Sequence, residues 1–400
     1  TASALVLLMT IPGLAFFYGG LVRRKNVLSI MMQCFVIVCV ISLQWMLFGY
    51  SLAFGPDFHG IIGNLDWMGL AGVGATPNPD YSGAIPHYAF MIFQAMFAII
   101  TPALIIGAYA ERVKFSAFLV FTLLWTTLVY DPLAHWVWGV GGWMRTLGAL
   151  DFAGGIVVHV SSGISALVLA LLLGKRIGYN HKPIRPHNLP FTVLGAALLW
   201  VGWFGFNAGS ALAADGLAAN AFVTTHIATA AAGITWALIE WWYSGTPTIL
   251  GAATGAVAGL VAVTPACGFV NPMNAMFIGM IVAVVCYIAV AIIKGKLGYD
   301  DSLDAFGVHG VGGTVGTIAT GLFAEKVVNA AGADGLLFGN AHQLYVQSLS
   351  LIVTVAFAAI MTFIIFKIVD ALIGMRVEEN NEVVGLDLTQ QSEAAYTVIE

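Results

Sequence analysis

The chain has 400 residues, of which 60% are apolar and only 9% are charged, with a net charge of −5. Soluble domains carry a charge on about a quarter of their residues, so this composition excludes an ordinary soluble domain, a nucleic-acid-binding protein and a disordered chain. The mean hydropathy of +0.91 indicates a membrane protein instead. At about 20 residues per crossing, the chain has room for roughly ten to twelve transmembrane helices.

Eleven apolar stretches are long enough to cross a bilayer. They are continuously apolar rather than alternating, which requires helices and not a barrel. The sequence therefore predicts an all-α membrane protein. In chain order we expect its spans at residues 1–19, 27–54, 85–110, 115–132, 151–174, 190–211, 218–243, 248–265, 273–294, 303–323 and 342–373.

The lysines and arginines orient these spans. All of them except Arg145 and Lys326 follow odd-numbered spans. Because cytoplasmic loops are enriched in cations, we expect the N-terminus outside and the C-terminus in the cytoplasm. The segment 374–400 is polar and acidic. This composition fits either a solvated tail or a docked regulatory segment.

Two segments of the chain resemble each other and predict an internal repeat. Residues 151–159 (DFAGGIVVH) open the fifth span, and residues 304–313 (DAFGVHGVGG) open the tenth. In each, we expect the aspartate, Asp151 or Asp304, to cap the start of a helix. Repeats offset by five spans run in opposite directions. We therefore expect a transmembrane domain at 1–373, made of two inverted five-helix repeats (1–174 and 190–323) and a long final helix (342–373), with a cytosolic tail at 374–400 and a substrate site between the repeats near the midplane.

A histidine follows each of these aspartates. A single histidine on an apolar face is usually a packing residue, as we expect for His226. His159 and His309 occupy symmetry-related positions in helices that are poor in polar groups, which favours a role in a pathway across the membrane.

The sequence predicts no metal site and no cofactor. We expect Cys34, Cys39, Cys267 and Cys286 to be buried thiols, because they lie in or beside apolar runs without C-x-x-C spacing. There is also no nucleophile–base arrangement, phosphate loop or metal spacing, so we do not expect an enzyme.

Seven motifs carry a resemblance to a known family: residues 17–23 (FYGGLVR), 110–112 (AER), 151–159, 186–190 (PHNLP), 202–210 (GWFGFNAGS), 264–268 (TPACG) and 306–310 (FGVHG). Together they resemble the Amt/Mep/Rh ammonium transporters, most closely the bacterial Amt branch, over essentially the whole chain. The resemblance implies a homotrimer in the cell inner membrane, embedded in lipid, with eleven helices and one pore in each subunit. It also implies a tail read by a cytosolic PII-type regulatory protein.

The resemblance further assigns roles to individual residues. Trp138, Phe97 and Ser210 match an outer site that binds ammonium, and Phe97 with Phe206 matches a gate of two rings below it. His159 and His309 match the pair of rings that lines the pore, and Asp151 matches a carboxylate buried near the outer site, for which capping the fifth span is the plain alternative. The implied mechanism is that NH4⁺ loses a proton at the outer site and crosses as NH3, with separate proton transfer that would make transport electrogenic.

Two other functions are compatible with the same residues. An ammonium sensor or transducer would need an output module after the last span, where 27 residues follow Ile373. An Rh-type channel for neutral gas would pass ammonia without a current.

Overall fold

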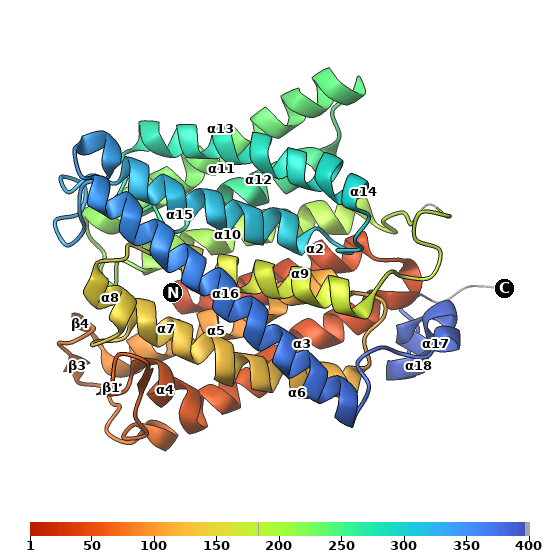
Figure 1. Cartoon of the computed structure of the whole chain (residues 1–400), viewed down its shortest axis with the longest axis horizontal. Helices are drawn as coiled ribbons and strands as arrows, with labels where there is room; N and C mark the ends of the chain where they lie inside the picture. Colours follow the sequence, from red (N-terminus) through yellow and green to blue (C-terminus); the bar gives the residue numbers. More distant parts are fainter. Residues whose placement is uncertain (183, 397–400) are drawn as a thin grey trace.

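The structure is a computed structural model that describes residues 1–182 and 184–396. The helices form a bundle with a common long axis (Figure 1). Nine helical segments of this described part are long and apolar enough to cross a membrane, and a shorter apolar helix lies at Ile249–Val263. These segments agree with the predicted helical, multi-pass membrane protein.

The first half of the bundle consists of α1 (Ala2–Leu8), η1 (Met9–Leu14), α2 (Ala15–Leu21), η2 (Arg24–Asn26), α3 (Val27–Gln44), η3 (Trp45–Gly49), α4 (Tyr50–Phe54), η4 (Met68–Leu70), α5 (His87–Tyr109), α6 (Phe115–Trp125), η5 (Thr126–Tyr130), α7 (Asp131–Trp138), α8 (Trp143–Leu147), η6 (Gly155–Val160) and α9 (Ser161–Leu173).

The second half consists of α10 (Leu189–Gly209), α11 (Gly216–Ser244), α12 (Ile249–Val263), α13 (Pro272–Tyr287), η7 (Ile288–Ile293), α14 (Lys294–Leu297), η8 (Phe306–Gly310), α15 (Val311–Phe323), η9 (Leu336–Phe338), α16 (Ala341–Leu372), α17 (Glu379–Val384) and α18 (Leu386–Gln391). The elements η1, η3 and η5 to η8 are π-helical turns that continue into a neighbouring helix.

Two small hairpins lie in the loop between α4 and α5. Strand β1 (Asp57–Phe58) pairs antiparallel with β2 (Ile62–Gly63), and β3 (Pro77–Asn78) pairs antiparallel with β4 (Ser82–Pro86). The hairpins lie at one end of the bundle, and the tail helices α17 and α18 lie at the opposite end (Figure 1).

Two expectations from the sequence were wrong in detail. The fourth span does not end at residue 132, because the helix continues through η5 and α7 to Trp138. Pro132 lies inside this continuous helix, directly after the π-helical turn η5, so one backbone N–H donor of the helix is missing there. Cys39 is exposed rather than buried, on an outward face of α3, whereas the other three cysteines are buried.

The tail is docked rather than solvated. The carboxylate of Glu382 in α17 accepts hydrogen bonds from the backbone N–H of Ile177 (2.6 Å) and from Arg376 (2.8 Å). In α18, Asp387 accepts a hydrogen bond from the backbone N–H of Ser29 (2.8 Å). These contacts tie the tail to the loop after α9 and to the start of α3.

A buried network of charges holds the loops at the same end of the bundle. Arg176 pairs with Asp300 (2.8 Å) and with Glu111 (3.2 Å), and Arg23 also pairs with Glu111 (2.8 Å). Burial acts to raise the pKa of Glu111, but Arg176 and Arg23 outweigh it and lower this pKa below its ordinary value. Burial and Arg176 oppose each other in the same way at Asp300, whose pKa is also lowered. Both carboxyl groups are therefore held in the charged form.

Candidate functional site

An outer cavity of about 210 Å³ lies at the end of the bundle that carries the hairpins, and Phe97, Trp138 and Ser210 all line it. The rings of Phe97 and Trp138 meet edge to face, with centroids 5.9 Å apart. The indole N–H of Trp138 donates to the backbone oxygen of Asp151 (2.9 Å), which fixes the ring. The hydroxyl of Ser210 donates to the backbone oxygen of Phe206 (2.9 Å), so its lone pairs remain available to accept a hydrogen bond.

Three further side chains with polar groups line this cavity, and sequence reasoning did not identify them as part of a site: Tyr81, Gln94 and Arg145. Gln94 lies one turn before Phe97, and its buried Oε1 has no hydrogen-bond partner among the described residues. Arg145 donates to the backbone oxygen of Trp138 (2.6 Å) at the rim. The amide oxygen of Gln94 adds an acceptor to the aromatic faces, and its position on the same helix face as Phe97 was the signal in the sequence.

A pair of stacked rings lies next to the cavity. Phe97 and Phe206 have centroids 4.1 Å apart and planes at 23°, and both side chains are buried. The ring of His159 follows, with its centroid 6.3 Å from that of Phe206. The aromatic rings thus lead from Trp138 into the interior of the bundle.

His159 and His309 are buried and meet inside the bundle. Their Nδ1 atoms lie 3.3 Å apart, and the rings are nearly parallel, at 15°, with centroids 5.3 Å apart. For a hydrogen bond between two such atoms, one Nδ1 must carry a proton and the other must accept it. His159 also stacks on Trp203 at 5.4 Å, and its buried Nε2 has no partner among the described residues.

Both histidines lie in π-helical turns, His159 in η6 and His309 in η8. A π-helical turn displaces the side chains that follow it from the ordinary helical register, and such turns are common at functional sites. The sequence motifs placed both histidines near helix starts but gave no sign of the π-helical geometry.

Each of the two helices begins at an aspartate, although one of them is not the residue predicted. The carboxylate of Asp151 accepts four backbone N–H bonds, from residues 154–157, at 2.6 to 3.1 Å. At the other helix the cap is Asp301, which accepts from Ala305 (3.1 Å) and Phe306 (2.8 Å). Asp304 was the wrong choice: it has a positive φ of 61° and pairs with Lys294 (2.7 Å).

This correction makes the two segments more alike. Asp151 precedes His159 by eight residues, and Asp301 precedes His309 by eight residues. The sequence favoured Asp304 because it lies only two residues before the F-G-V-H motif at 306–309, whereas Asp301 lies three residues earlier.

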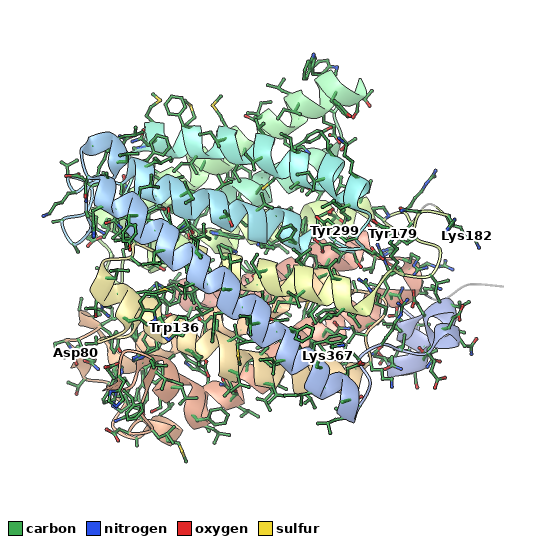
Figure 2. All side chains as sticks on the ribbon, viewed as in Figure 1. Asp80, Trp136, Tyr179, Lys182, Tyr299 and Lys367 are labelled. Carbon is green, nitrogen blue, oxygen red and sulfur yellow. The ribbon has the colours of Figure 1, made fainter. Side chains whose placement is uncertain are left out.

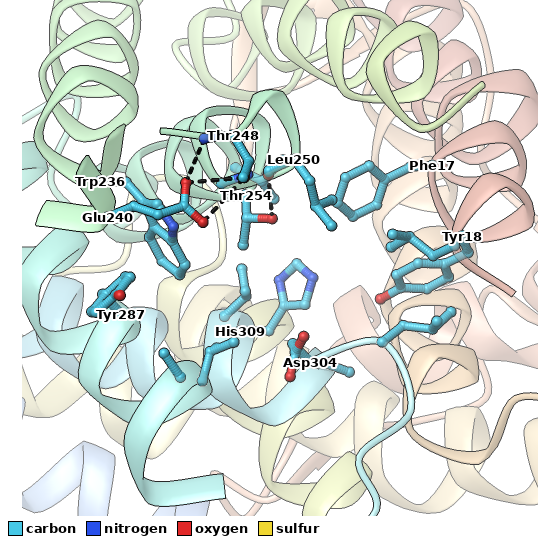
Figure 3. Close-up of a pocket in the computed structure, with 18 of the residues that line it drawn as sticks. Phe17, Tyr18, Trp236, Glu240, Thr248, Leu250, Thr254, Tyr287, Asp304 and His309 are labelled. Carbon is cyan, nitrogen blue, oxygen red and sulfur yellow. Dashed lines mark hydrogen bonds between the residues drawn. The ribbon is translucent and has the colours of Figure 1, made fainter. Parts of the chain in front are cut away.

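An inner cavity of about 280 Å³ lies beside His309, and Figure 3 shows His309 among the residues that line it. Tyr18, Glu240 and Asp304 are among the residues that line it. The carboxylate of Glu240 accepts a hydrogen bond from the backbone N–H of Thr248 (2.8 Å) and from its hydroxyl. Two carboxylates thus lie on the far side of the histidine pair from the outer cavity; the sequence signal for Glu240 was that it is the single acidic residue in the stretch 218–243.

Glycines bring the two histidine-bearing helices together. A Cβ on Gly163 would lie 2.0 Å from the backbone nitrogen of Gly310, and one on Gly313 would lie 2.9 Å from the Cβ of His159. Any side chain at Gly163 would force α9 and η8 apart. The distance between the two imidazole rings therefore depends on this glycine contact.

Comparison with known proteins identifies the family. Residues 1–396 match the sequence profile of the Ammonium Transporter Family. The chain belongs to this family.

Individual relatives agree with this assignment. The chain is 56% identical over 392 residues to the ammonium transporter of Bacillus subtilis (98% of this chain, 96% of the relative), and 48% identical over 397 residues to ammonium transporter Amt1 of Archaeoglobus fulgidus (99% and 97%). Among solved structures, that of Saccharomyces cerevisiae Mep2 superposes with a TM-score of 0.89 at 37% identity, covering 95% of this chain and 86% of Mep2. A protein described as a sensor Amt also superposes with a TM-score of 0.89, at 30% identity, covering 97% and 96%.

The resemblance predicted from the motifs is thus confirmed, and this member of the family is an ammonium transporter. His226, which the sequence left without a role, is exposed and has its ring 5.4 Å from that of Trp200 and 6.2 Å from that of Phe204. It lies on the surface of α11 against α10, away from the histidine pair.

Proposed function

We propose that NH4⁺ binds in the outer cavity, loses a proton there, and crosses as NH3 past Phe206, His159 and His309 into the inner cavity. The observation that supports this most directly is the pair of imidazole rings in hydrogen-bond contact between two cavities. The substrate is ammonium, as the family implies.

The outer cavity has the chemistry that a small cation requires. The faces of Trp138 and Phe97 attract a cation through the ring quadrupole, by about 2 kcal/mol or more where water is excluded. The oxygen atoms of Ser210 and Gln94 can accept N–H hydrogen bonds from ammonium. Asp151 contributes its charge at longer range, because its oxygens already cap η6.

The buried path explains why ammonium must lose its proton before it enters the interior. An unpaired cation in a dry interior loses solvation worth tens of kcal/mol in the ideal Born limit. K⁺ is similar in size to NH4⁺, so a sieve would not separate them. Only ammonium can lose its charge by giving up a proton, and this difference supplies the selectivity.

The histidines pass neutral ammonia between hydrogen bonds, because a neutral imidazole offers one donor and one acceptor. The proton released at the outer cavity crosses separately from ammonia. The histidine pair and the two carboxylates of the inner cavity can each hold this proton on its way. Transport then moves one charge for each ammonium.

We also propose the finer architecture that the sequence predicts. In the domain 1–373, the nine long helices, α12, and the continuous helix formed by η8 and α15 make eleven crossings. The equal Asp-to-His spacing at residues 151–159 and 301–309 supports two inverted repeats. Lys182 and Lys367 lie at the end opposite Asp80 (Figure 2), which supports a cytoplasmic C-terminus in the cell inner membrane.

The remaining proposals concern partners. Each subunit contains its own pair of cavities, so a homotrimer would have one pore per subunit. The docked tail at 374–396 offers a surface at the cytosolic end that a PII-type regulatory protein could read.

The test is transport in proteoliposomes. On a solid-supported membrane, an ammonium jump should evoke a current and a K⁺ jump should not, with empty liposomes as the control. A dye for internal pH distinguishes the alternative channel for neutral gas, which would make the lumen alkaline without a current. Failure to move ammonium faster than empty liposomes would rule out the proposed function.

A further inference from the structure

Arg145 places a positive charge at the outer cavity, where the substrate is itself a cation. Its side chain lines the cavity together with Trp138, Phe97 and Ser210. One guanidinium nitrogen, Nη1, donates to the backbone oxygen of Trp138 (2.6 Å), which holds the group against the end of α7. The guanidinium group of an arginine stays charged under the conditions in which proteins work. Every cation that enters the cavity therefore meets this charge.

The charge of Arg145 is not neutralised by a neighbouring acid. In the ranges 1–182 and 184–396, no carboxylate lies within ion-pair distance of its guanidinium group. Both oxygens of Asp151 accept backbone N–H bonds at the start of η6, and Asp57 pairs with His135 (2.8 Å). Arg145 is thus an unpaired cation in a cavity whose aromatic rings and oxygen acceptors suit a cation.

A fixed positive charge acts differently on ammonium and on ammonia. It repels NH4⁺ but not NH3, because a like charge nearby favours the neutral form of a titrating group. The cavity volume of about 210 Å³ corresponds to a sphere about 7 Å across, which limits the distance between the two charges. The side chain of Arg145 is exposed, so water screens this repulsion. Two unit charges about 7 Å apart in water still change an equilibrium constant about threefold.

We propose that Arg145 promotes release of the ammonium proton and so acts as a selectivity residue of the outer cavity. In this step one N–H bond of NH4⁺ breaks, its electron pair stays on nitrogen, and the proton leaves on a water molecule at the rim. K⁺ meets the same repulsion but has no proton to lose, so Arg145 weakens K⁺ binding without helping K⁺ onward. The inference rests on the proposed function, because it requires that ammonium loses its proton in this cavity.

The experiment is a concentration series of ammonium-evoked currents on a solid-supported membrane for the unsubstituted chain, Arg145→Gln and Arg145→Lys. Arg145→Gln removes the charge, so ammonium should bind more tightly but release its proton less readily. We expect the half-saturating ammonium concentration and the saturating current both to fall about threefold. Arg145→Lys keeps the charge and should keep both values close to those of the unsubstituted chain.

Inhibition by K⁺ tests the selectivity role separately. K⁺ added with ammonium should inhibit Arg145→Gln at about one third of the concentration that inhibits the unsubstituted chain. Lys326→Gln is the matched control, because Lys326 follows α15 at the same end of the bundle as α8 (Figure 1) but does not line the cavity. Its currents and its inhibition by K⁺ should match those of the unsubstituted chain.

A purely structural role for Arg145, as a hydrogen-bond donor at the end of α7, predicts a different result. Both arginine variants would then lose saturating current without a fall in the half-saturating concentration, and both would unfold at a lower temperature in detergent. That result would overturn the proposal, as would a fall in neither or only one of the two values, or equal inhibition by K⁺. Failure of the proposed function is distinct, because it would remove the ammonium current of the unsubstituted chain itself.

Discussion

Single side chains decide which molecules can occupy the outer cavity. The cavity offers aromatic rings and oxygen acceptors to the proposed cation, and Trp138 is anchored by its hydrogen bond to the backbone of Asp151. The indole therefore offers its face to the cavity and uses its N–H elsewhere. We therefore expect ammonium transport to tolerate a substitution of Trp138 that keeps an aromatic face.

Trp138→Leu should raise the ammonium concentration for half-maximal current about thirtyfold, since about 2 kcal/mol of cation–π attraction is lost. Trp138→Phe keeps an aromatic face and should change it by only a few-fold. The measurement is a concentration series of ammonium-evoked currents. A leucine variant that matches the phenylalanine variant would remove Trp138 from the binding site.

Sequence alone located the residues of the site but could not supply their contacts. The family resemblance pointed to Phe97, Phe206, His159 and His309, and in the structure the rings of these residues follow one another from the cavity to the histidine pair. Gln94 and Glu240 were missed, because helical spacing tells which residues share a face but not whether that face lines a cavity. Only the packing of the neighbouring helices shows that these two side chains line the cavities.

At the scale of helices, two helix starts and one glycine contact position the histidines. Asp151 and Asp301 cap η6 and η8, and Gly163 allows α9 to touch η8 at Gly310. Apolar run length predicted these helices well, because a bilayer requires about 20 apolar residues. It could not choose between Asp301 and Asp304 as the cap, since both precede the apolar run and only backbone conformation separates them.

Asp301→Ala should destabilise the protein by about 1 kcal/mol through loss of the cap, and it should reduce transport because η8 carries His309. Asp304→Ala removes only a partly exposed pair with Lys294 and should cost less in stability. Thermal unfolding in detergent and ammonium flux measure both effects. Equal losses of stability in the two variants would contradict the assignment of Asp301 as the cap.

Gly163→Ala should abolish most transport and destabilise the protein by about 1 to 3 kcal/mol, because the added methyl group overlaps the backbone of Gly310. Gly216→Ala is the matched control, since a Cβ there meets nothing within 4 Å. Flux and unfolding temperature are compared for the two variants. Normal flux in Gly163→Ala would show that the contact does not set the distance between the histidines.

For the whole molecule, the two ends of the bundle differ in how they are held together. One end carries short hairpins, whereas the end with the tail has buried pairs between Arg176, Asp300, Glu111 and Arg23. Positive charge in the loops after odd-numbered spans predicts a cytoplasmic C-terminus, and this orientation stays a prediction. The sequence could not decide between a solvated and a docked tail. The tail contacts residues more than two hundred positions away in the chain, and sequence patterns do not show such contacts.

Acid should destabilise the tail end. The pKa of Glu111 is lowered in the folded state, so its contribution to stability is present above its ordinary value of 4.5 and is lost as the pH falls through the lowered pKa. The unfolding temperature should therefore fall below about pH 4.5. Glu111→Gln should lower it at pH 7 and flatten the acid dependence; an unchanged acid dependence would contradict this role.

The central claim is that ammonium leaves its charge behind before it passes the two imidazoles. The most direct test compares ammonium and K⁺ currents in the same proteoliposomes for the unsubstituted chain, His159→Ala and His309→Ala. We predict that the unsubstituted chain passes no K⁺ current, and that each variant loses ammonium current or gains a K⁺ current. Unchanged ammonium current with K⁺ still excluded in both variants would contradict the claim.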